Sequence, residues 1–160
     1  MIPLVLAVWQ RVVRVVGVVS IAAVLAGCGV VSRTPPAPTP ADFLGISSSL
    51  VARGIAIDHV VSGDAGCRDA NLAKTAISFR ASGLDQTTPV PVYLYIFGSR
   101  ESFVNRRGDV DTCARSYVTD PQAFASIDAS PFVLAGQGPW APRFSAALRA
   151  GLTEAAGTGG

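Results

Sequence analysis

A single histidine, His59, is the side chain of this sequence best suited to act as a general base near neutral pH. Two carboxylates, Asp64 and Asp69, follow it within ten residues. A histidine oriented by a carboxylate can activate water, so His59 with Asp64 or Asp69 is a candidate hydrolytic site. His59 also lies in an alternating apolar stretch, which favours a buried, hydrogen-bonded structural histidine. Both interpretations stay open, and the pattern favours the structural one.

The loop Ser62–Asp69 is the most unusual polar segment of the chain, with two glycines, two aspartates, a cysteine and an arginine. Its carboxylates could cap turns or bind a cation through oxygen, but their spacing does not match a calcium-binding helix-loop-helix. Turn chemistry is the simpler interpretation. If the domain binds a ligand, we expect contacts from Asp64, Arg68 and Asp69. Trp140 is a further candidate, although a tryptophan between a strand and a helix more commonly closes a core.

The N-terminal residues have the layout of an export signal. Arg11 and Arg14 precede the apolar run Val15–Ala26, which is shorter than the roughly 20 residues that a membrane-spanning helix needs. The run leads into Leu25-Ala26-Gly27-Cys28. These four residues resemble the lipobox of bacterial lipoproteins, in which a leucine is followed by two small residues and a cysteine.

The resemblance implies that residues 1–27 are a signal peptide, that the chain is cut before Cys28, and that the Cys28 thiol carries a diacylglycerol. The protein is then expected at the extracytoplasmic face of the cell membrane, held by an N-terminal lipid. Because residues 1–9 are also apolar, two alternatives stay open: a translation start further downstream, or an uncleaved signal anchor over residues 1–27. Two arginines inside the anchor argue against it. The resemblance covers only about the first 30 residues and implies nothing about the domain beyond them.

The other two cysteines form an even pair. If Cys28 carries lipid, Cys67 and Cys113 remain outside the cytosol, where disulfides persist, and we expect them to be bonded. Two free buried thiols are the alternative. Two cysteines and a distant histidine do not supply the four ligands of a structural zinc site. We therefore predict neither a metal nor another cofactor.

The charge of the mature chain gives no indication of an anionic partner. Arg11 and Arg14 are two of the 13 basic residues, so the basic residues after Cys28 balance the 11 acidic ones. A formally neutral domain gives no electrostatic case for nucleic acid or anionic lipid.

The composition divides the chain into four parts. Residues 28–40 contain four prolines and predict an extended tether. Residues 41–157 are long enough for one domain, and residues 158–160 form a flexible C-terminus.

The periodicity predicts an α+β two-layer sandwich, with about four mainly antiparallel strands and helices packed on one face. Tyr93 and Tyr95 share one face of a central strand, where core packing is the simpler interpretation and a sugar-binding platform the alternative. Gly108-Asp109 could divide one helical region into two helices. In order, the expected elements are a helix at 41–54, strands at 55–61, 74–82 and 90–97, helical structure at 99–117, a short helix at 121–126, a strand at 132–135 and a helix at 142–157.

Two functions remain open at this point. The favoured one is a membrane-anchored lipoprotein of the cell envelope with a small non-enzymatic domain that binds a protein or small molecule. The alternative is a small extracytoplasmic hydrolase that uses His59 with Asp64 or Asp69. The sequence favours binding, because a single histidine in an apolar strand is a weak candidate for a base.

Overall fold

The computed structural model describes residues 42–157. The predicted signal peptide, Cys28, the tether and residues 158–160 lie outside the described residues. The described part of the chain therefore falls within the predicted domain, residues 41–157.

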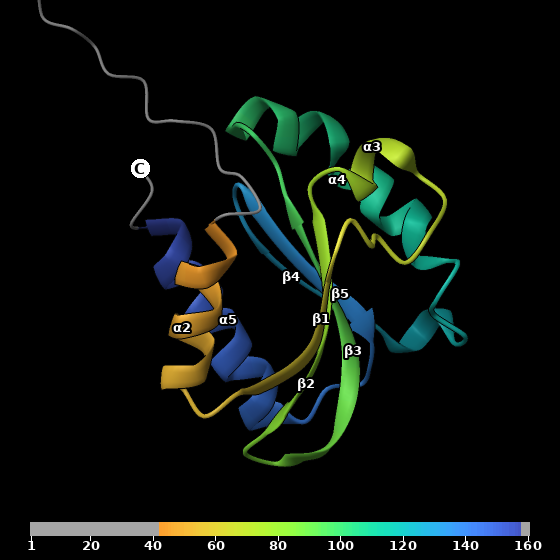
Figure 1. The fold of residues 1–160 in the computed structure, drawn as a ribbon. Coiled ribbons are helices and arrows are strands. Elements are labelled where there is room, and N and C mark those ends of the chain that lie inside the picture. The colour runs from red at the N-terminus through yellow and green to blue at the C-terminus, as the bar shows by residue number, and fades with distance from the viewer. Residues whose placement is uncertain (1–41, 158–160) are drawn as a thin grey trace, which may run out of the picture. The chain divides into compact units, whose positions relative to one another are not determined.

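The described residues form an α+β domain built on one sheet, which confirms the predicted class (Figure 1). Most of the expected elements occur within a few residues of the predicted bounds. The elements, in chain order, are α2 (Phe43–Ala52), β1 (Ala56–Ser62), α3 (Ala70–Ala73), β2 (Ala76–Gly83), β3 (Gln86–Ile96), α4 (Arg100–Ala114), the 3₁₀ turn η3 (Pro121–Ala123), β4 (Phe124–Ala129), β5 (Phe132–Gln137) and α5 (Pro142–Gly157).

The sheet is antiparallel throughout and has the strand order β1-β2-β3-β5-β4. β2 and β3 form an antiparallel hairpin, in which Phe79 lies opposite Val92 and Ser78 lies opposite Tyr93. The apolar residues on both faces of β3 predict a central strand, and β3 does lie in the middle of the sheet.

Helices α2 and α5 cover one face of the sheet (Figure 1). Ile46 and Leu50 of α2 and Leu148 of α5 are at most 1% exposed. They belong to a core that includes Leu94 and Leu134 of the central strands. This packing accounts for the apolar stripe of the last helix, whose docking the sequence predicted.

Helices α3 and α4 lie on the other face, so the expectation of helices on one face alone is corrected (Figure 1). Tyr95 and Val133 on this face form a second core with Leu72 of α3 and with Val110 and Cys113 of α4. The reason is that β3 and β5 carry apolar side chains on both faces and must be covered twice.

The sheet has one strand more than predicted, and the additional strand is β4. With the η3 turn before it, β4 takes the place of the short helix expected at residues 121–126. Asp120 accepts a hydrogen bond from the Gln122 N–H at 3.0 Å and caps a single 3₁₀ turn. The chain then pairs with β5, with Ile127 opposite Leu134. Asp120 and Pro121 therefore begin a single turn rather than a longer helix. Cross-strand pairing determines the conformation of the residues that follow.

Helix α4 is continuous through Gly108, so the two-helix alternative is wrong. Ser99 caps it, accepting a hydrogen bond from the Ser102 N–H at 3.0 Å. A glycine inside a helix costs about 1 kcal/mol relative to alanine. The burial of Val110 and Cys113 against the sheet offsets that cost.

Candidate functional site

The loop predicted as the ligand site is folded by its own aspartates. Asp64 accepts hydrogen bonds from the Gly66 N–H at 2.9 Å and from the Ser78 hydroxyl of β2 at 2.7 Å. Both carboxylate oxygens are therefore used to fasten the loop to the sheet. Ser78 is only 9% exposed, and its hydroxyl is satisfied by Asp64.

Asp69 caps the short helix α3 at the end of the same loop. Its carboxylate accepts hydrogen bonds from the N–H groups of Asn71 at 2.8 Å and Leu72 at 3.0 Å. The bond from Leu72 is the main cause that lowers the pKa of Asp69. The turn interpretation of both aspartates is thereby confirmed. Arg68, between them, is exposed and has no charged partner among residues 42–157.

The disulfide between Cys67 and Cys113 is confirmed, with the two Cα atoms 5.4 Å apart. It joins the loop to α4 across 46 residues of sequence. Cys113 is 3% exposed, and its sulfur contacts the Ala65 carbonyl oxygen at 3.0 Å. The loop is thus held to β2 by Asp64 and to α4 by the disulfide.

Three tyrosines form the floor beneath this loop. The Tyr95 hydroxyl donates to the Ala65 carbonyl at 2.8 Å and lies 3.2 Å from the Tyr117 hydroxyl. The ring of Tyr93 stacks on that of Tyr117, with centroids 4.2 Å apart. Because Tyr95 is 0% exposed and the other two rings pack on each other, core packing accounts for these aromatics better than a sugar-binding platform.

Burial moves the pKa values of the three tyrosines further above neutrality. Desolvation raises the pKa of Tyr93 and Tyr95 and raises the pKa of Tyr117 to about 12. All three hydroxyls stay protonated at neutral pH, and those of Tyr95 and Tyr117 act as hydrogen-bonding groups.

His59 is exposed, so the buried structural interpretation is wrong. Its side chain is 70% exposed, and its backbone has φ +50° within an irregularity of β1 between Asp58 and Val61. This irregularity breaks the alternation on which the prediction relied. The Nδ1 atom of His59 lies 2.6 Å from an oxygen of Asp58, a partner that the sequence analysis missed.

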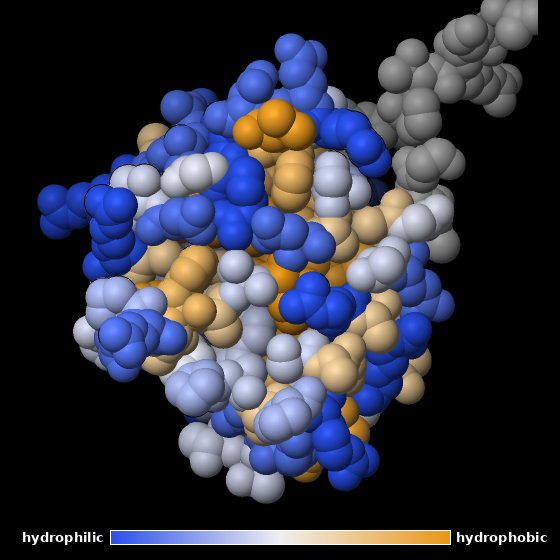
Figure 2. Space-filling view, turned by 180° about the vertical axis from the view of Figure 1, so that it is seen from behind, coloured by the Kyte–Doolittle hydropathy of each residue, from blue (hydrophilic) through white to orange (hydrophobic). Residues whose placement is uncertain are grey.

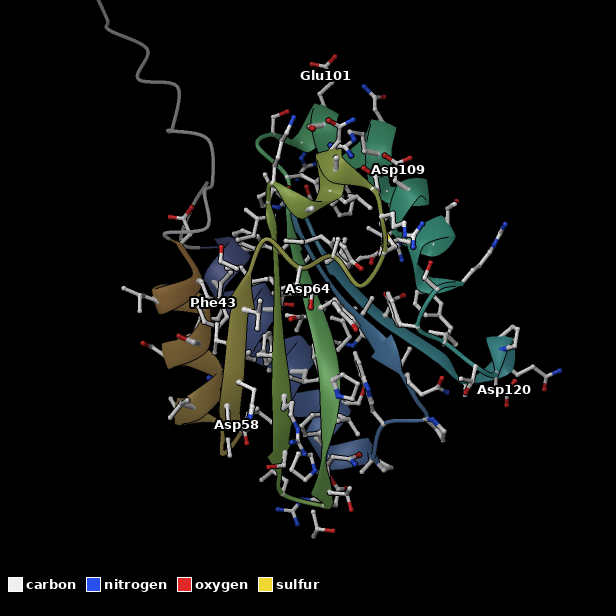
Figure 3. All side chains as sticks on the ribbon, turned by 45° about the vertical axis from the view of Figure 1, so that its right-hand side comes forward. Phe43, Asp58, Asp64, Glu101, Asp109 and Asp120 are labelled. Carbon is white, nitrogen blue, oxygen red and sulfur yellow. A yellow bond between two sulfur atoms is a disulfide. The ribbon has the colours of Figure 1, made fainter. Side chains whose placement is uncertain are left out.

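The proposed pairing of His59 with Asp64 or Asp69 is not formed. Asp64 is engaged by its own loop and by β2, and Asp69 is engaged by α3. Asp58, which contacts His59, lies apart from Asp64 (Figure 3). The His59–Asp58 pair orients an imidazole in solvent. No hydroxyl or thiol among residues 42–157 forms a hydrogen bond to it.

Trp140 does not join the loop residues. It is 9% exposed within the core beneath α2 and α5, edge-on to Phe144 with ring centroids 6.2 Å apart. Its indole N–H has no hydrogen-bond partner within the described part of the chain. Of the four predicted ligand-binding residues, Asp64, Arg68 and Asp69 lie together in the loop. Trp140 belongs to the core on the opposite face of the sheet.

Two side chains whose roles the sequence pattern does not reveal, Arg107 and Asp85, hold the helices in place. Arg107 of α4 bonds both oxygens of Asp128 in β4 at 2.8 and 2.9 Å and Asp111 at 2.7 Å. Asp85, in the β2–β3 turn, accepts from the N–H groups of Arg143 at 2.9 Å and Phe144 at 2.8 Å. The absence of an Asp, Asn, Ser or Thr just before Pro142 was the only signal that α5 needs a remote cap.

Within residues 42–157 there is no group of three or more His, Cys, Asp or Glu side chains that could hold a metal ion. In the same residues, none of the helices has the length and apolar character needed to span a membrane. On the face shown in Figure 2, apolar residues occur as small islands among polar ones. Comparisons with protein family models, with curated proteins and with solved structures found no match to this chain.

Proposed function

We propose that this chain is an exported lipoprotein of the cell envelope, anchored by a lipid on Cys28, whose domain is a non-enzymatic binding module. The disulfide between Cys67 and Cys113 is the observation that carries the proposal. Disulfides form and persist outside the reducing cytosol. The bond therefore supports export, the same destination that the lipobox-like residues 25–28 indicate.

The loop around Arg68 is the proposed contact surface of the module. The disulfide at Cys67 fixes one side of Arg68, and the helix cap at Asp69 fixes the other. The Arg68 side chain is exposed and has no charged partner within residues 42–157, so its guanidinium is available to a carboxylate or phosphate group of a partner. Asp64 and Asp69 shape this surface rather than contact the ligand.

The test of the anchor is metabolic labelling of the full chain in its native host with an alkyne-bearing fatty acid. Wild-type protein should take up the label and enter the detergent phase on phase partition. Cys28→Ala should take up no label and should keep residues 1–27, because cleavage follows lipidation. The Cys67→Ser/Cys113→Ser variant is the matched control and should be labelled like the wild type. Unlabelled wild type, or label that persists in Cys28→Ala, would refute the anchor.

A further inference from the structure

We propose that the exposed face of helix α2 lies in the membrane–water interface and gives the domain a second, apolar contact with the lipid surface. The inference rests on the proposed lipid anchor at Cys28. It adds an orientation: the domain would lie with α2 toward the bilayer.

The outer face of α2 carries no charged residue and presents two exposed apolar side chains among serines. The helix has the sequence FLGISSSLVA, without a charged residue. Leu44 is 75% exposed and Val51 is 57% exposed. They are seven residues apart, so they lie on one side of the helix, two turns from each other. Exposed apolar side chains of this kind bury readily at a lipid interface.

The three serine hydroxyls of α2 are all paired, Ser49 with Glu154 of α5 and the other two within the helix. The hydroxyls of Ser48 and Ser47 donate to the Leu44 carbonyl at 2.7 and 3.1 Å. A hydroxyl that is hydrogen-bonded to its own helix loses less on leaving water than a free hydroxyl. The outer face can therefore enter a less polar environment at reduced cost.

The inner face holds α2 in its present rotation. Ile46 and Leu50 are at most 1% exposed, and a Cβ added at Gly151 of α5 would come within 2.7 Å of the Leu50 side chain. With the inner positions filled so closely, the helix cannot rotate to bury Leu44 and Val51 in the core. These two side chains can be covered only from outside the domain.

The position of α2 next to the tether favours a lipid surface as the partner of its exposed face. It is the first helix after the tether, with 13 residues between Cys28 and Asp42. Such a segment reaches about 40 Å when extended. Tethering at this range corresponds to an effective concentration on the order of millimolar, so even a weak contact is populated. The neutral mature chain indicates an apolar rather than an electrostatic contact.

The experiment places a tryptophan on each helical layer of the lipidated mature protein, residues 28–160, which no longer contains Trp9. The protein is reconstituted in phosphatidylcholine vesicles with brominated acyl chains. Leu44→Trp reports on α2. Val104→Trp on α4 is the matched control, because Val104 is also apolar and 69% exposed but lies on the other side of the sheet. Unsubstituted protein supplies the background from the buried Trp140. Bromolipid should quench Leu44→Trp at least roughly twofold more than Val104→Trp, and Val51→Trp should behave like Leu44→Trp.

The outcomes separate this inference from the proposed anchor. If the protein does not float with the vesicles, the anchor fails and the orientation fails with it. If it floats and Leu44→Trp is quenched no more than Val104→Trp, the anchor stands and the orientation is wrong. A Leu44→Trp signal shielded from aqueous iodide but not quenched by bromolipid would identify a protein as the occupant and would likewise overturn the inference.

Discussion

At the scale of single residues, Gly66 shows how closely the loop fits its floor. It has φ +73°, and an added Cβ would lie 2.6 Å from the Tyr117 ring and 2.8 Å from the Tyr93 ring. These rings stack on each other, so neither can move aside alone. A glycine is required here both for its backbone conformation and for space.

We predict that Gly66→Ala destabilises the domain by roughly 2–5 kcal/mol, the sum of the left-handed backbone cost and the ring clash. Gly63→Ala is the matched control. It has φ +83°, but its added Cβ would meet only a backbone oxygen at 4.0 Å, so it should cost roughly 1–2 kcal/mol. Urea denaturation measures both changes. Equal losses would show that the rings do not confine Gly66.

The sequence predicted the roles of some of these residues and not of others. Asp64, Asp69 and the two cysteines were correctly interpreted, because turn capping and disulfide pairing depend on residue type and local spacing. His59 was misplaced, because an irregularity in β1 is invisible to a rule of alternation. The hydrogen bond that Ser78 donates to Asp64 joins residues 14 apart and depends on how the loop folds back over the sheet.

At the scale of elements, the capping of α5 by Asp85 links the β2–β3 turn to the last helix. Burial raises the pKa of Asp85, but the hydrogen bonds from Arg143 and Phe144 outweigh it and hold the pKa below its usual 3.8. A carboxylate with a lowered native pKa stabilises the fold at pH values above its unfolded pKa. That contribution is lost as the pH falls through the native value.

We therefore predict that Asp85→Asn lowers the urea midpoint at pH 6 and that the gap to the wild type narrows by pH 3. Asp120→Asn is the control for loss of a negative charge, because Asp120 caps only the local η3 turn. It should lower the midpoint at pH 6 by less than Asp85→Asn. A gap for Asp85→Asn that stays constant between the two pH values would contradict this role of the carboxylate.

The elements that the sequence predicted well have a strong apolar pattern. In β3 this is the apolar run from Val90 onward, and in α5 it is the apolar stripe. The missed strand β4 has the sequence FASIDA, in which alanines weaken the alternation. Its identity as a strand comes from pairing with β5, a tertiary contact. The sequence prediction had helices on only one face of the sheet. The apolar residues on both faces of β3 require a helical layer on each face.

At the scale of the whole molecule, the disulfide is the strongest single constraint on the domain. Closing the 46-residue separation between Cys67 and Cys113 is worth about 4 kcal/mol in the chain-entropy account. Small domains have a total stability of about 5–15 kcal/mol. Losing the disulfide would therefore remove a large share of it.

We predict that Cys67→Ser/Cys113→Ser lowers the free energy of unfolding by about 4 kcal/mol, as measured by urea denaturation. Treating the wild type with a dithiol reductant should produce the same shift. The reductant should leave the double variant unchanged, which controls for other effects of the reagent. A loss below about 1 kcal/mol would show that Asp64 and the tyrosines hold the loop without the covalent bond.

The central claim is that this chain leaves the cytoplasm, acquires lipid at Cys28 and closes one disulfide. Intact mass spectrometry of the protein purified from its native host tests all three parts in one spectrum. We predict a chain that begins at Cys28, carries the mass of a diacylglycerol modification and is two hydrogens lighter than the reduced form. A spectrum in which residues 1–27 are retained and no lipid is attached would contradict the account.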